Sequence, residues 1–169
     1  MDHLWSPWRM NYINSKPDGL ECVFCYAEQH SEDSEFLILH RGIKAFVILN
    51  RYPYTSGHLM VLPYDHQPSY EDLDAVTRSE MMELINNATK ILRQVYNPHG
   101  FNLGANIGED AGAGIAPHFH FHIVPRWRGD SNFMSVTSDT RVLPEDLQVS
   151  YERLKEAWDQ LGVIGYPRA

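Results

Sequence analysis

The stretch "HFHFHIVPRW", residues 118–127, places a histidine at every second position among large apolar side chains. A period of two is typical of a β-strand with one buried face. Side chains two residues apart share a face, so His118, His120 and His122 are expected to project together. The apolar residues between them would then point into the core. The pattern therefore predicts a strand over residues 117–125 with a row of three imidazoles on one face.

Three apolar runs of strand length come earlier, at residues 35–41, 44–50 and 57–63, and turn-forming residues separate them. Their close spacing predicts an antiparallel meander. A further strand is expected over residues 101–108, and the glycine-containing segment 109–116 would connect it to the histidine strand as a flexible loop. The sequence thus predicts about five strands.

The hydrophobic period changes to three and four residues from Thr77 onward, which indicates an amphipathic helix of about five turns. Thr77 and Glu80 have the spacing of a capping box at its start, and "NPHG" at residues 97–100 ends it. A second helix is expected over residues 144–161, opening at Pro144. Residues 31–35 are predicted to be a polar loop. Five antiparallel strands with helices on one face define an α+β domain.

Length and charge limit the class of protein. The 169 residues are 43% hydrophobic, which suits one domain with a real core. The net charge of −8 argues against a general nucleic-acid-binding protein, which needs a basic surface. No stretch resembles a membrane span or a secretory signal, so we expect a soluble cytoplasmic protein with no membrane partner.

The histidine row is better explained by function than by packing. Each buried imidazole without a hydrogen-bond partner costs about 1–3 kcal/mol, so three in strict alternation are improbable as ordinary core residues. Two chemistries remain open at this point. A His-x-His pair can hold a catalytic zinc, or one neutral imidazole can act as a nucleophile. The glycine-rich segment 104–117 precedes the row and favours phosphate binding by backbone N–H groups.

Cys22 and Cys25, in "CVFC", are the two cysteines of the chain. Their spacing suits a metal site or a redox pair, and it is also compatible with two small buried neighbours. The spacing alone does not decide among these three.

Two segments together resemble one known family. "HFHFHIV" resembles the motif of the histidine triad (HIT) superfamily of nucleotidyl hydrolases and transferases, and "LNRYPYTSGHLMVLP" is similar to that family's strand–loop–strand segment. The flanks "LWSPWRMNYI", "VPRWRGDSNFM" and "TRVLPEDL" resemble the branch that contains bacterial diadenosine tetraphosphate (Ap4A) phosphorylases. The resemblance implies a single HIT domain over residues 1–169. Its core would span about 22–128, with an N-terminal aromatic arm (1–21) and a C-terminal helical extension (129–169).

The resemblance also implies roles for the histidines. His120 would be the nucleophile that carries AMP as a phosphoramidate, because a neutral imidazole attacks well at pH 7 and leaves readily once protonated. His122 would donate a hydrogen bond to the phosphoryl oxygens, with His58 near the same group. All three are therefore expected to be catalytic.

The same resemblance implies the substrate-binding residues. Asn50 would bind the ribose, while Ile48 and Met60 would flank the adenine. Gly114 and Ile115 would lie near the phosphate together with His122. Relatives carry serine, threonine or glutamine where this chain has Gly114 and Ile115, which leaves open the acid that protonates the leaving group.

For the cysteines, the resemblance implies a structural zinc ion, one per chain. Its ligands would be Cys22, Cys25, His66 and His118, a closed Cys₂His₂ set of the kind that holds a structural rather than a catalytic ion.

The activity implied is transfer of an adenylyl group from an adenine dinucleoside polyphosphate by way of His120, most closely as an Ap4A phosphorylase with inorganic phosphate as acceptor. Arg126 and Arg128, just past the triad, are positioned in the sequence where an anion could be held. The alternatives are a hydrolase of Ap3A, Ap4A or adenosine phosphoramidates, and a nucleotide sensor without catalysis. The family fold also implies a homodimer in which two protomers form one continuous sheet.

Overall fold

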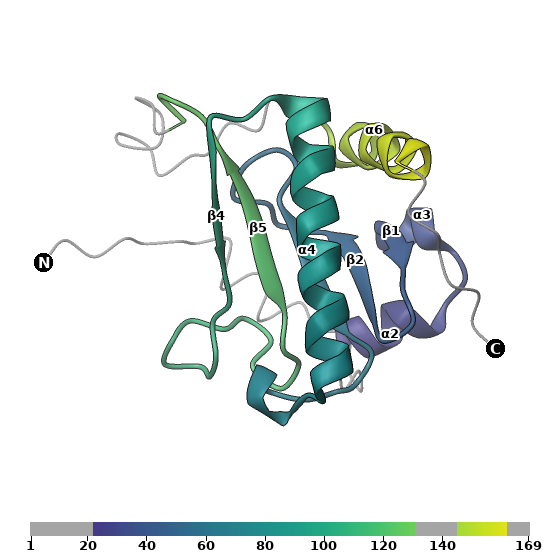
Figure 1. The fold of residues 1–169 in the computed structure, drawn as a ribbon, viewed down its shortest axis with the longest axis vertical. Helices are drawn as coiled ribbons and strands as arrows, with labels where there is room; N and C mark the ends of the chain where they lie inside the picture. The colour runs from purple at the N-terminus through teal and green to yellow at the C-terminus, as the bar shows by residue number, and fades with distance from the viewer. Residues whose placement is uncertain (1–21, 131–144, 162–169) are drawn as a thin grey trace, which may run out of the picture.

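The computed structural model describes residues 22–130 and 145–161. The predicted N-terminal arm, Pro144 and much of the predicted C-terminal extension lie outside these ranges. The described chain forms these elements in order: α2 (Val23–Gln29), α3 (Asp33–Phe36), β1 (Ile38–Arg41), β2 (Ala45–Leu49), β3 (Leu59–Pro63), the 3₁₀ turn η1 (Tyr70–Asp72), α4 (Ala75–Tyr96), β4 (Gly100–Gly104), β5 (Phe121–Arg126) and α6 (Leu147–Gln160) (Figure 1).

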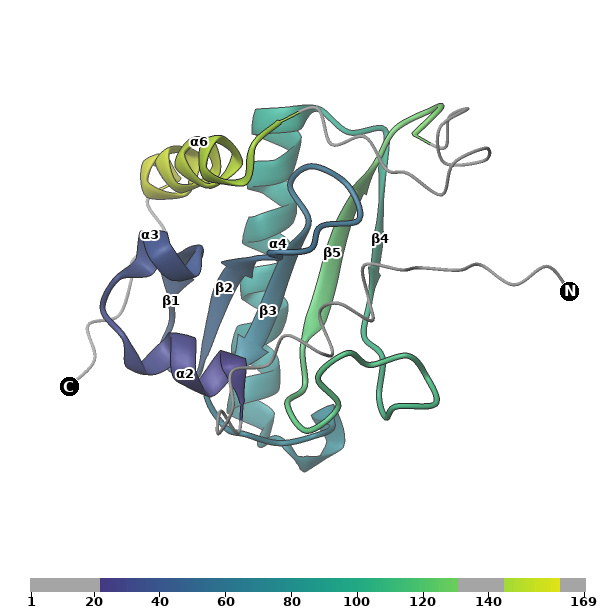
Figure 2. The same cartoon turned by 180° about the vertical axis from the view of Figure 1, so that it is seen from behind.

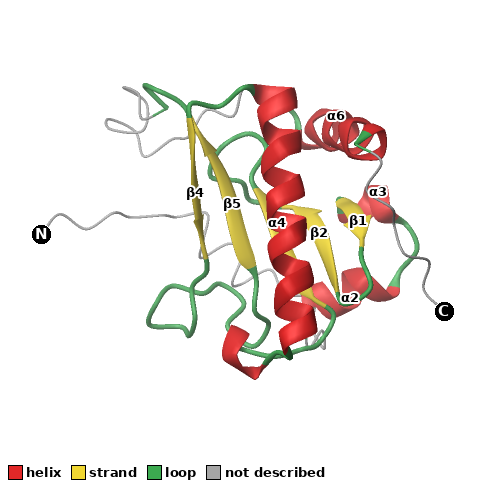
Figure 3. Ribbon diagram, viewed as in Figure 1, coloured by secondary structure: helices red, strands yellow, loops and turns green. Residues whose placement is uncertain are grey.

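The five strands form one antiparallel sheet in the order β1-β2-β3-β5-β4 (Figure 3). The first three strands are consecutive neighbours, which confirms the predicted meander. β5 then pairs with β3 on one side and β4 on the other, so the strand that contains His122 lies inside the sheet and not at its edge. The predicted α+β class is confirmed.

The histidine strand begins later than its alternation predicts. β5 starts at Phe121, and His118 and His120 lie in the segment that leads into it. The backbone N–H of Phe119 donates to the carbonyl of Gln67 at 2.7 Å, and that of His118 donates to Ile115 at 3.2 Å. Because these two amides donate to carbonyl groups in loops, they are not available for strand pairing. The hydrogen-bond ladder of β5 therefore does not extend to residues 118 and 119. The prediction of a single strand over residues 117–125 is therefore wrong at its start.

β4 is shorter than predicted for the same reason. It ends at Gly104, which pairs with His122 near the start of β5, so the residues beyond have no strand beside them. The chain then turns into the glycine-rich loop, where Gly108 has a φ of +84° and Gly112 a φ of +91°.

Helix α4 begins two residues before Thr77, and its N-cap is Asp74. The Asp74 side chain accepts a hydrogen bond from the Thr77 backbone N–H at 2.8 Å, which is the ordinary capping geometry. The predicted capping box is therefore wrong. The carboxylate of Glu80 instead accepts from the backbone N–H groups of Ile43 and Lys44 in the β1–β2 turn.

The end of α4 lies where it was predicted, since Asn97 adopts the left-handed conformation that follows many helices. Helix α6 starts at Leu147, not at Pro144, and Asp146 caps it by accepting from the Gln148 N–H at 2.8 Å. The short helices α2 and α3 were not predicted. Each spans two turns or fewer, too short for a periodic signal, and α3 covers most of the predicted polar loop.

The helices lie on both sides of the sheet. α4 crosses one face, against β2, β3 and β5, while α6 packs beside α4 and over β1 (Figure 1). α2 lies on the opposite side from α4 (Figure 2). The prediction that helices cover a single face therefore holds for α4 and fails for α2.

Side chains alternate along the strands, so one set faces the core and the next set shares the opposite face of the sheet. Leu49, Leu59 and Ile123 are in register and almost fully buried. The next set, which comprises Ile48, Met60 and His122, shares the other face. The strands thus bury one set of side chains in the core and bring an aliphatic pair beside His122 on the other face.

In the described ranges, no helix has the length and the apolar composition needed to cross a membrane.

Candidate active site

Three histidines meet where β3 and β5 begin. His58 directly precedes β3, and His122 is the second residue of β5, which pairs with β3. The His58 Nε2 atom lies 2.9 Å from the His122 Nδ1 atom, and the ring centroids of His120 and His122 are 4.9 Å apart. The sheet thereby brings together residues 64 positions apart in the sequence.

His120 is buried and held by a backbone group. Its Nδ1 atom lies 2.8 Å from the carbonyl oxygen of His118 and must donate to it, because a carbonyl can only accept. In the neutral ring the Nε2 atom then carries the free lone pair. Burial lowers the pKa of His120, and the hydrogen bond to the His118 carbonyl opposes that shift. His120 is therefore neutral at pH 7 with a nucleophilic Nε2.

Phe24, on α2, contributes to the burial of His120. The Phe24 ring centroid is 5.3 Å from that of His120 and 5.5 Å from that of His118. Sequence reasoning missed this contact, although Phe24 stands between the two cysteines of "CVFC".

His122 is also neutral. Burial first, and then the neighbouring His120, lower its pKa to about 4. Tyr54 lies over the pair, with its ring centroid 4.6 Å from that of His58 and 6.0 Å from that of His122. Sequence reasoning assigned no role to Tyr54, although its place in the loop before the Gly-His pair was an available signal.

The residues predicted to bind the nucleoside lie next to His122. Ile48 pairs with Met60, and Met60 pairs with His122, so the three side chains are adjacent on one face. Asn50 follows β2, and its side chain contacts the Nδ1 atom of His58 through Nδ2 at 3.3 Å. In the loop that leads to the triad, Gly114 is exposed and Ile115 is buried.

Cys22, Cys25, His66 and His118 form a second cluster, whose ligand atoms all lie within 4.8 Å of one another. His118 Nδ1 is 3.4 Å from Cys22 Sγ and 3.5 Å from Cys25 Sγ, and His66 Nδ1 is 3.2 Å from Cys25 Sγ. Four such ligands at about 2.0 Å (nitrogen) and 2.3 Å (sulfur) from a tetrahedral ion would be roughly 3.3–3.8 Å apart. The donor set therefore fits a closed metal site.

The orientation of the His118 ring agrees with this. Its Nε2–H donates to the carbonyl of Pro63 at 2.9 Å, which leaves the Nδ1 lone pair facing the cysteines. Burial, followed by the neighbouring Cys22, raises the pKa of the Cys25 thiol to about 11. A metal ion would have to displace that proton, so binding would be coupled to proton release.

Arg126 does not lie at the triad. It is four residues beyond His122 on β5, roughly 13 Å along the strand. Its Nε and Nη2 atoms donate to Asp130 and its Nη1 donates to Asn102. The suggestion that Arg126 holds an anion for the reaction is not supported by this geometry.

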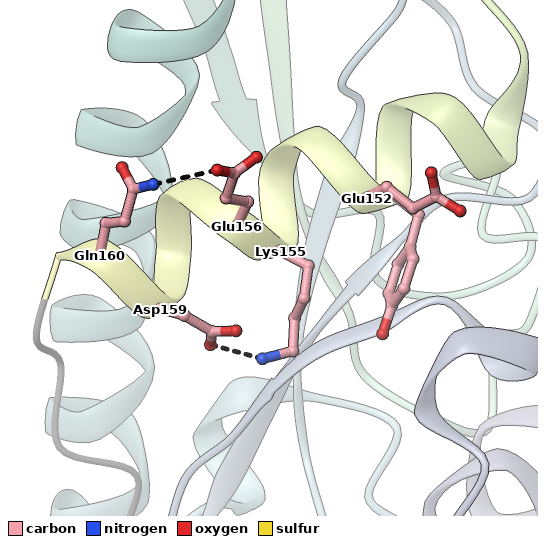
Figure 4. Close-up of a pocket in the computed structure, with 6 residues that line it drawn as sticks. Glu152, Lys155, Glu156, Asp159 and Gln160 are labelled. Atoms are coloured by element: carbon pink, nitrogen blue, oxygen red, sulfur yellow. Dashed lines mark hydrogen bonds and ion pairs between the residues drawn. The ribbon is translucent and has the colours of Figure 1, made fainter.

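A hollow elsewhere on the surface runs along α6 and is lined by residues of that helix alone (Figure 4). A Lys155–Asp159 ion pair spans part of it. None of the triad or cluster residues lines this hollow, so we assign it no function.

Comparisons with known proteins show the family to which the chain belongs. The HIT domain profile matches residues 32–129, and the chain belongs to the HIT family. The AP-4-A phosphorylase of Mycobacterium tuberculosis is 37% identical over 165 residues, which cover 94% of this chain and 85% of that protein. The bis(5'-nucleosyl)-tetraphosphatase (asymmetrical) of Schizosaccharomyces pombe is 27% identical over 93 residues, 55% of this chain and 50% of that protein.

Among solved structures, a zinc-bound histidine triad family protein from Mycobacterium smegmatis superposes with a TM-score of 0.67 at 27% identity, covering 83% of this chain and 95% of that one. A hypothetical histidine triad nucleotide-binding protein from Sulfolobus tokodaii also gives a TM-score of 0.67, at 26% identity over 83% of this chain and 93% of that one. These similarities confirm the HIT fold expected from the two sequence motifs.

Proposed function

We propose that this protein is an Ap4A phosphorylase that transfers an adenylyl group through a covalent His120–AMP intermediate. The observation that carries the proposal is the state of His120, which is buried, neutral and pinned at Nδ1 so that Nε2 is the attacking atom. The similarity to the AP-4-A phosphorylase over nearly the whole chain supports the choice of substrate.

The chemistry has two displacement steps. His120 Nε2 attacks the α-phosphorus, the bridging P–O bond breaks, and its electron pair leaves with the nucleoside polyphosphate. An oxygen of inorganic phosphate then attacks the same phosphorus, and the P–N bond breaks to return the electron pair to Nε2. His122 is the donor to the phosphoryl oxygens, because its neutral ring can keep an N–H directed at them throughout.

We assign the nucleoside to the face formed by Ile48 and Met60, next to His122. Asn50 would bind the ribose through the remaining hydrogen-bonding capacity of its amide. The segment with Gly114 and Ile115 would approach the phosphates through its backbone.

A structural zinc ion would be held by the cluster of two cysteines and two histidines, one ion per chain. When bound, it would fix His118, whose backbone carbonyl orients His120, and the start of α2, which carries Phe24. The residues of the zinc site would thus hold the nucleophile, His120, in position. Paired reduced thiols of this kind also suit the cytoplasm.

β4 is an outer strand of the sheet, and its Asn102 and Leu103 side chains are exposed. An exposed edge strand can pair with another strand. We propose that two protomers associate as a homodimer through this side.

A hydrolase is the second candidate, and the similarity to the S. pombe tetraphosphatase favours it. The phosphoramidate hydrolase and sensor alternatives have no such support, and catalysis explains the held lone pair of His120 better than binding alone does.

Product analysis distinguishes the two candidates. Purified protein is incubated with Ap4A while phosphate is varied from absent to millimolar, and nucleotides are separated by chromatography. A phosphorylase gives ATP and ADP in amounts that depend on phosphate. Formation of ATP and AMP at the same rate without phosphate, and no ADP with it, would establish a hydrolase in its place.

A further inference from the structure

Tyr96, the last residue of α4, lies between helix α6 and the loop that precedes β3. Its hydroxyl donates a hydrogen bond to the carboxylate of Glu145, just before α6, and the guanidinium of Arg153 on α6 lies 5.0 Å from the centroid of its ring. The same ring approaches Gly57 so closely that a Cβ atom added there would lie 2.8 Å from Tyr96 Cε2. One side chain therefore contacts both the C-terminal helix and the residue that precedes His58.

The carboxylate of Glu145 accepts hydrogen bonds from three side chains. The Ser150 hydroxyl donates to Oε2 at 2.7 Å, and the Tyr96 hydroxyl donates to the same oxygen. Arg153 forms an ion pair with Oε1, and its Nη2 atom donates to the Val95 carbonyl at 3.2 Å. Burial, followed by the hydrogen bond to Glu145, raises the pKa of Tyr96 to about 12, so the phenol stays a donor at neutral pH. Because hydrogen bonds to a charged acceptor are stronger than neutral ones, Glu145 fixes the position of the Tyr96 ring.

Gly57 packs against α4 without free space. An added Cβ atom would also lie 2.9 Å from the Leu92 side chain, and the φ of Gly57 is +77°, a conformation that glycine adopts without strain. The loop is also held from β5, where the Thr55 hydroxyl donates to the Pro125 carbonyl at 2.9 Å. A closely packed contact of this kind transmits a displacement instead of absorbing it. A shift of the Tyr96 ring is therefore expected to move Gly57.

His58 follows Gly57 directly, so its backbone moves with that glycine. Its ring meets the triad through Nε2, which lies 2.9 Å from His122 Nδ1. α4 lies on the opposite side of the sheet from α2, the helix that packs against His120 (Figure 2). Tyr96 thus supports His58 from the side of the sheet away from the proposed substrate site. It acts through the chain and not by contact with a nucleotide.

We propose that Tyr96 and Glu145 are positioning residues for the histidine site. They hold His58, and through it His122, at the geometry that the reaction needs. This inference rests on the proposed function, because its kinetic readout is the turnover of Ap4A. Glu145 and helix α6 lie beyond residues 32–129, the range that matches the HIT domain profile. Part of the support for the active site thus comes from the C-terminal extension of this chain.

The kinetic test compares two tyrosines that each lose only a hydroxyl group. Tyr96→Phe removes the hydrogen bond to Glu145, whereas Tyr151→Phe, the matched control, removes a donor to the Ile38 carbonyl at 3.2 Å on β1. We expect Tyr96→Phe to lower kcat for Ap4A by about 10–10²-fold with KM changed by less than about twofold, since a misplacement of about 1 Å can cost about 10²-fold in rate. The control should lose a similar amount of Tm and keep its kcat. Equal kcat values in the two variants would overturn the inference.

A second set of variants tests whether the two residues act as one unit. Glu145→Ala removes the acceptor and should reproduce the kcat of Tyr96→Phe, and the double variant should be no slower than either single variant. Glu145→Gln keeps an acceptor oxygen and should restore most of the kcat. Multiplied losses in the double variant, or equal kcat values for Glu145→Gln and Glu145→Ala, would contradict a shared role.

A spectroscopic readout needs no substrate. In ¹⁵N-histidine-labelled protein, the ring signals of His58 and His122 are assigned by their loss in His58→Gln and His122→Gln. We expect both signals to shift in Tyr96→Phe and in Glu145→Ala, and to stay in place in Tyr151→Phe. A variant that is less stable but has the same folded structure gives no such shift. Unshifted signals in Tyr96→Phe and Glu145→Ala would overturn the inference whatever the turnover.

The outcomes separate this inference from the proposed function. If the wild-type protein leaves Ap4A intact, the proposed function fails, and the NMR comparison alone decides whether Tyr96 and Glu145 position His58. If Ap4A is cleaved and Tyr96→Phe keeps the wild-type kcat, the proposed function stands and the inference fails.

Discussion

His118 links the metal-binding cluster to the nucleophile His120. Its ring presents Nδ1 to Cys22 and Cys25, while its backbone carbonyl accepts the Nδ1–H of His120 at 2.8 Å. One residue thereby belongs to both centres. Any change that moves the His118 ring is expected to turn the His120 ring as well.

The first prediction concerns the nucleophile. His120→Ala should lower turnover of Ap4A by about 10⁴-fold or more, since no other described group offers a held imidazole lone pair to the phosphorus. Nucleotide affinity should change only a few-fold, because the base and ribose contacts come from β2 and β3. Turnover assays and calorimetric titration with AMP measure these two effects. Retained turnover in His120→Ala would exclude a covalent intermediate on this residue. His99→Ala, at an exposed position, is the control variant and should keep its turnover.

The second prediction concerns the metal. Elemental analysis of purified protein should find about one zinc ion per chain. Cys22→Ser should reduce stability by roughly 2–3 kcal/mol, or about 5–10 °C in Tm for a chain of 169 residues. A chelator should bring the wild-type protein to a similar Tm without altering the variant further. Metal-free protein with an undiminished Tm would count against the site.

The third prediction concerns Gly57, which precedes His58. Its φ is +77°, and a Cβ atom there would lie 2.8 Å from the Tyr96 ring and 2.9 Å from Leu92, both on α4. Gly57→Ala should therefore destabilise the protein by about 2–4 kcal/mol, through backbone strain and overpacking. Gly100→Ala, where nothing lies within 4 Å of the added atom, is the matched control. Denaturant unfolding of both variants is the measurement, and equal stabilities would refute the packing argument.

The fourth prediction concerns acid stability. His40 is buried and stacks on Trp158, and burial, then Lys155, lowers its pKa, although Glu80 and Asp159 oppose the shift. A lowered pKa means that the unfolded chain binds a proton first as pH falls below about 6.5. This residue's contribution to stability is thus present above pH 6.5 and is lost as pH falls through the folded-state pKa.

His40→Gln should make the loss of unfolding free energy below pH 6.5 shallower, by at most about 1.4 kcal/mol for each unit of pKa shift. Urea unfolding at pH values from 7.5 to 5 measures this, with His99→Gln as a surface control. A slope that is the same in wild type and His40→Gln would mean that His40 has no part in acid sensitivity.

The sequence by itself determined the family and most of the fold. Local patterns indicated these features: the alternation around His120, the meander and the period of α4. Such patterns can be recognised without knowledge of distant contacts. The family resemblance also implied the four cluster residues as one ligand set, and the structure places their ligand atoms near one another. Their roles in catalysis and in zinc binding stay predictions.

Only the tertiary structure decided where the hydrogen-bond ladder of β5 begins and which groups form hydrogen bonds with the histidines. β5 begins at Phe121 because the amide of Phe119 bonds to Gln67, a partner 52 positions away that no periodicity reveals. The Asn50 and His58 side chains likewise accept hydrogen bonds from the backbone amides of Tyr52 and Tyr54, which their side-chain types do not indicate. Hydrogen bonds from backbone groups carry no sequence signature, since every residue except proline has the same N–H. Such features follow only from the folded arrangement of the chain.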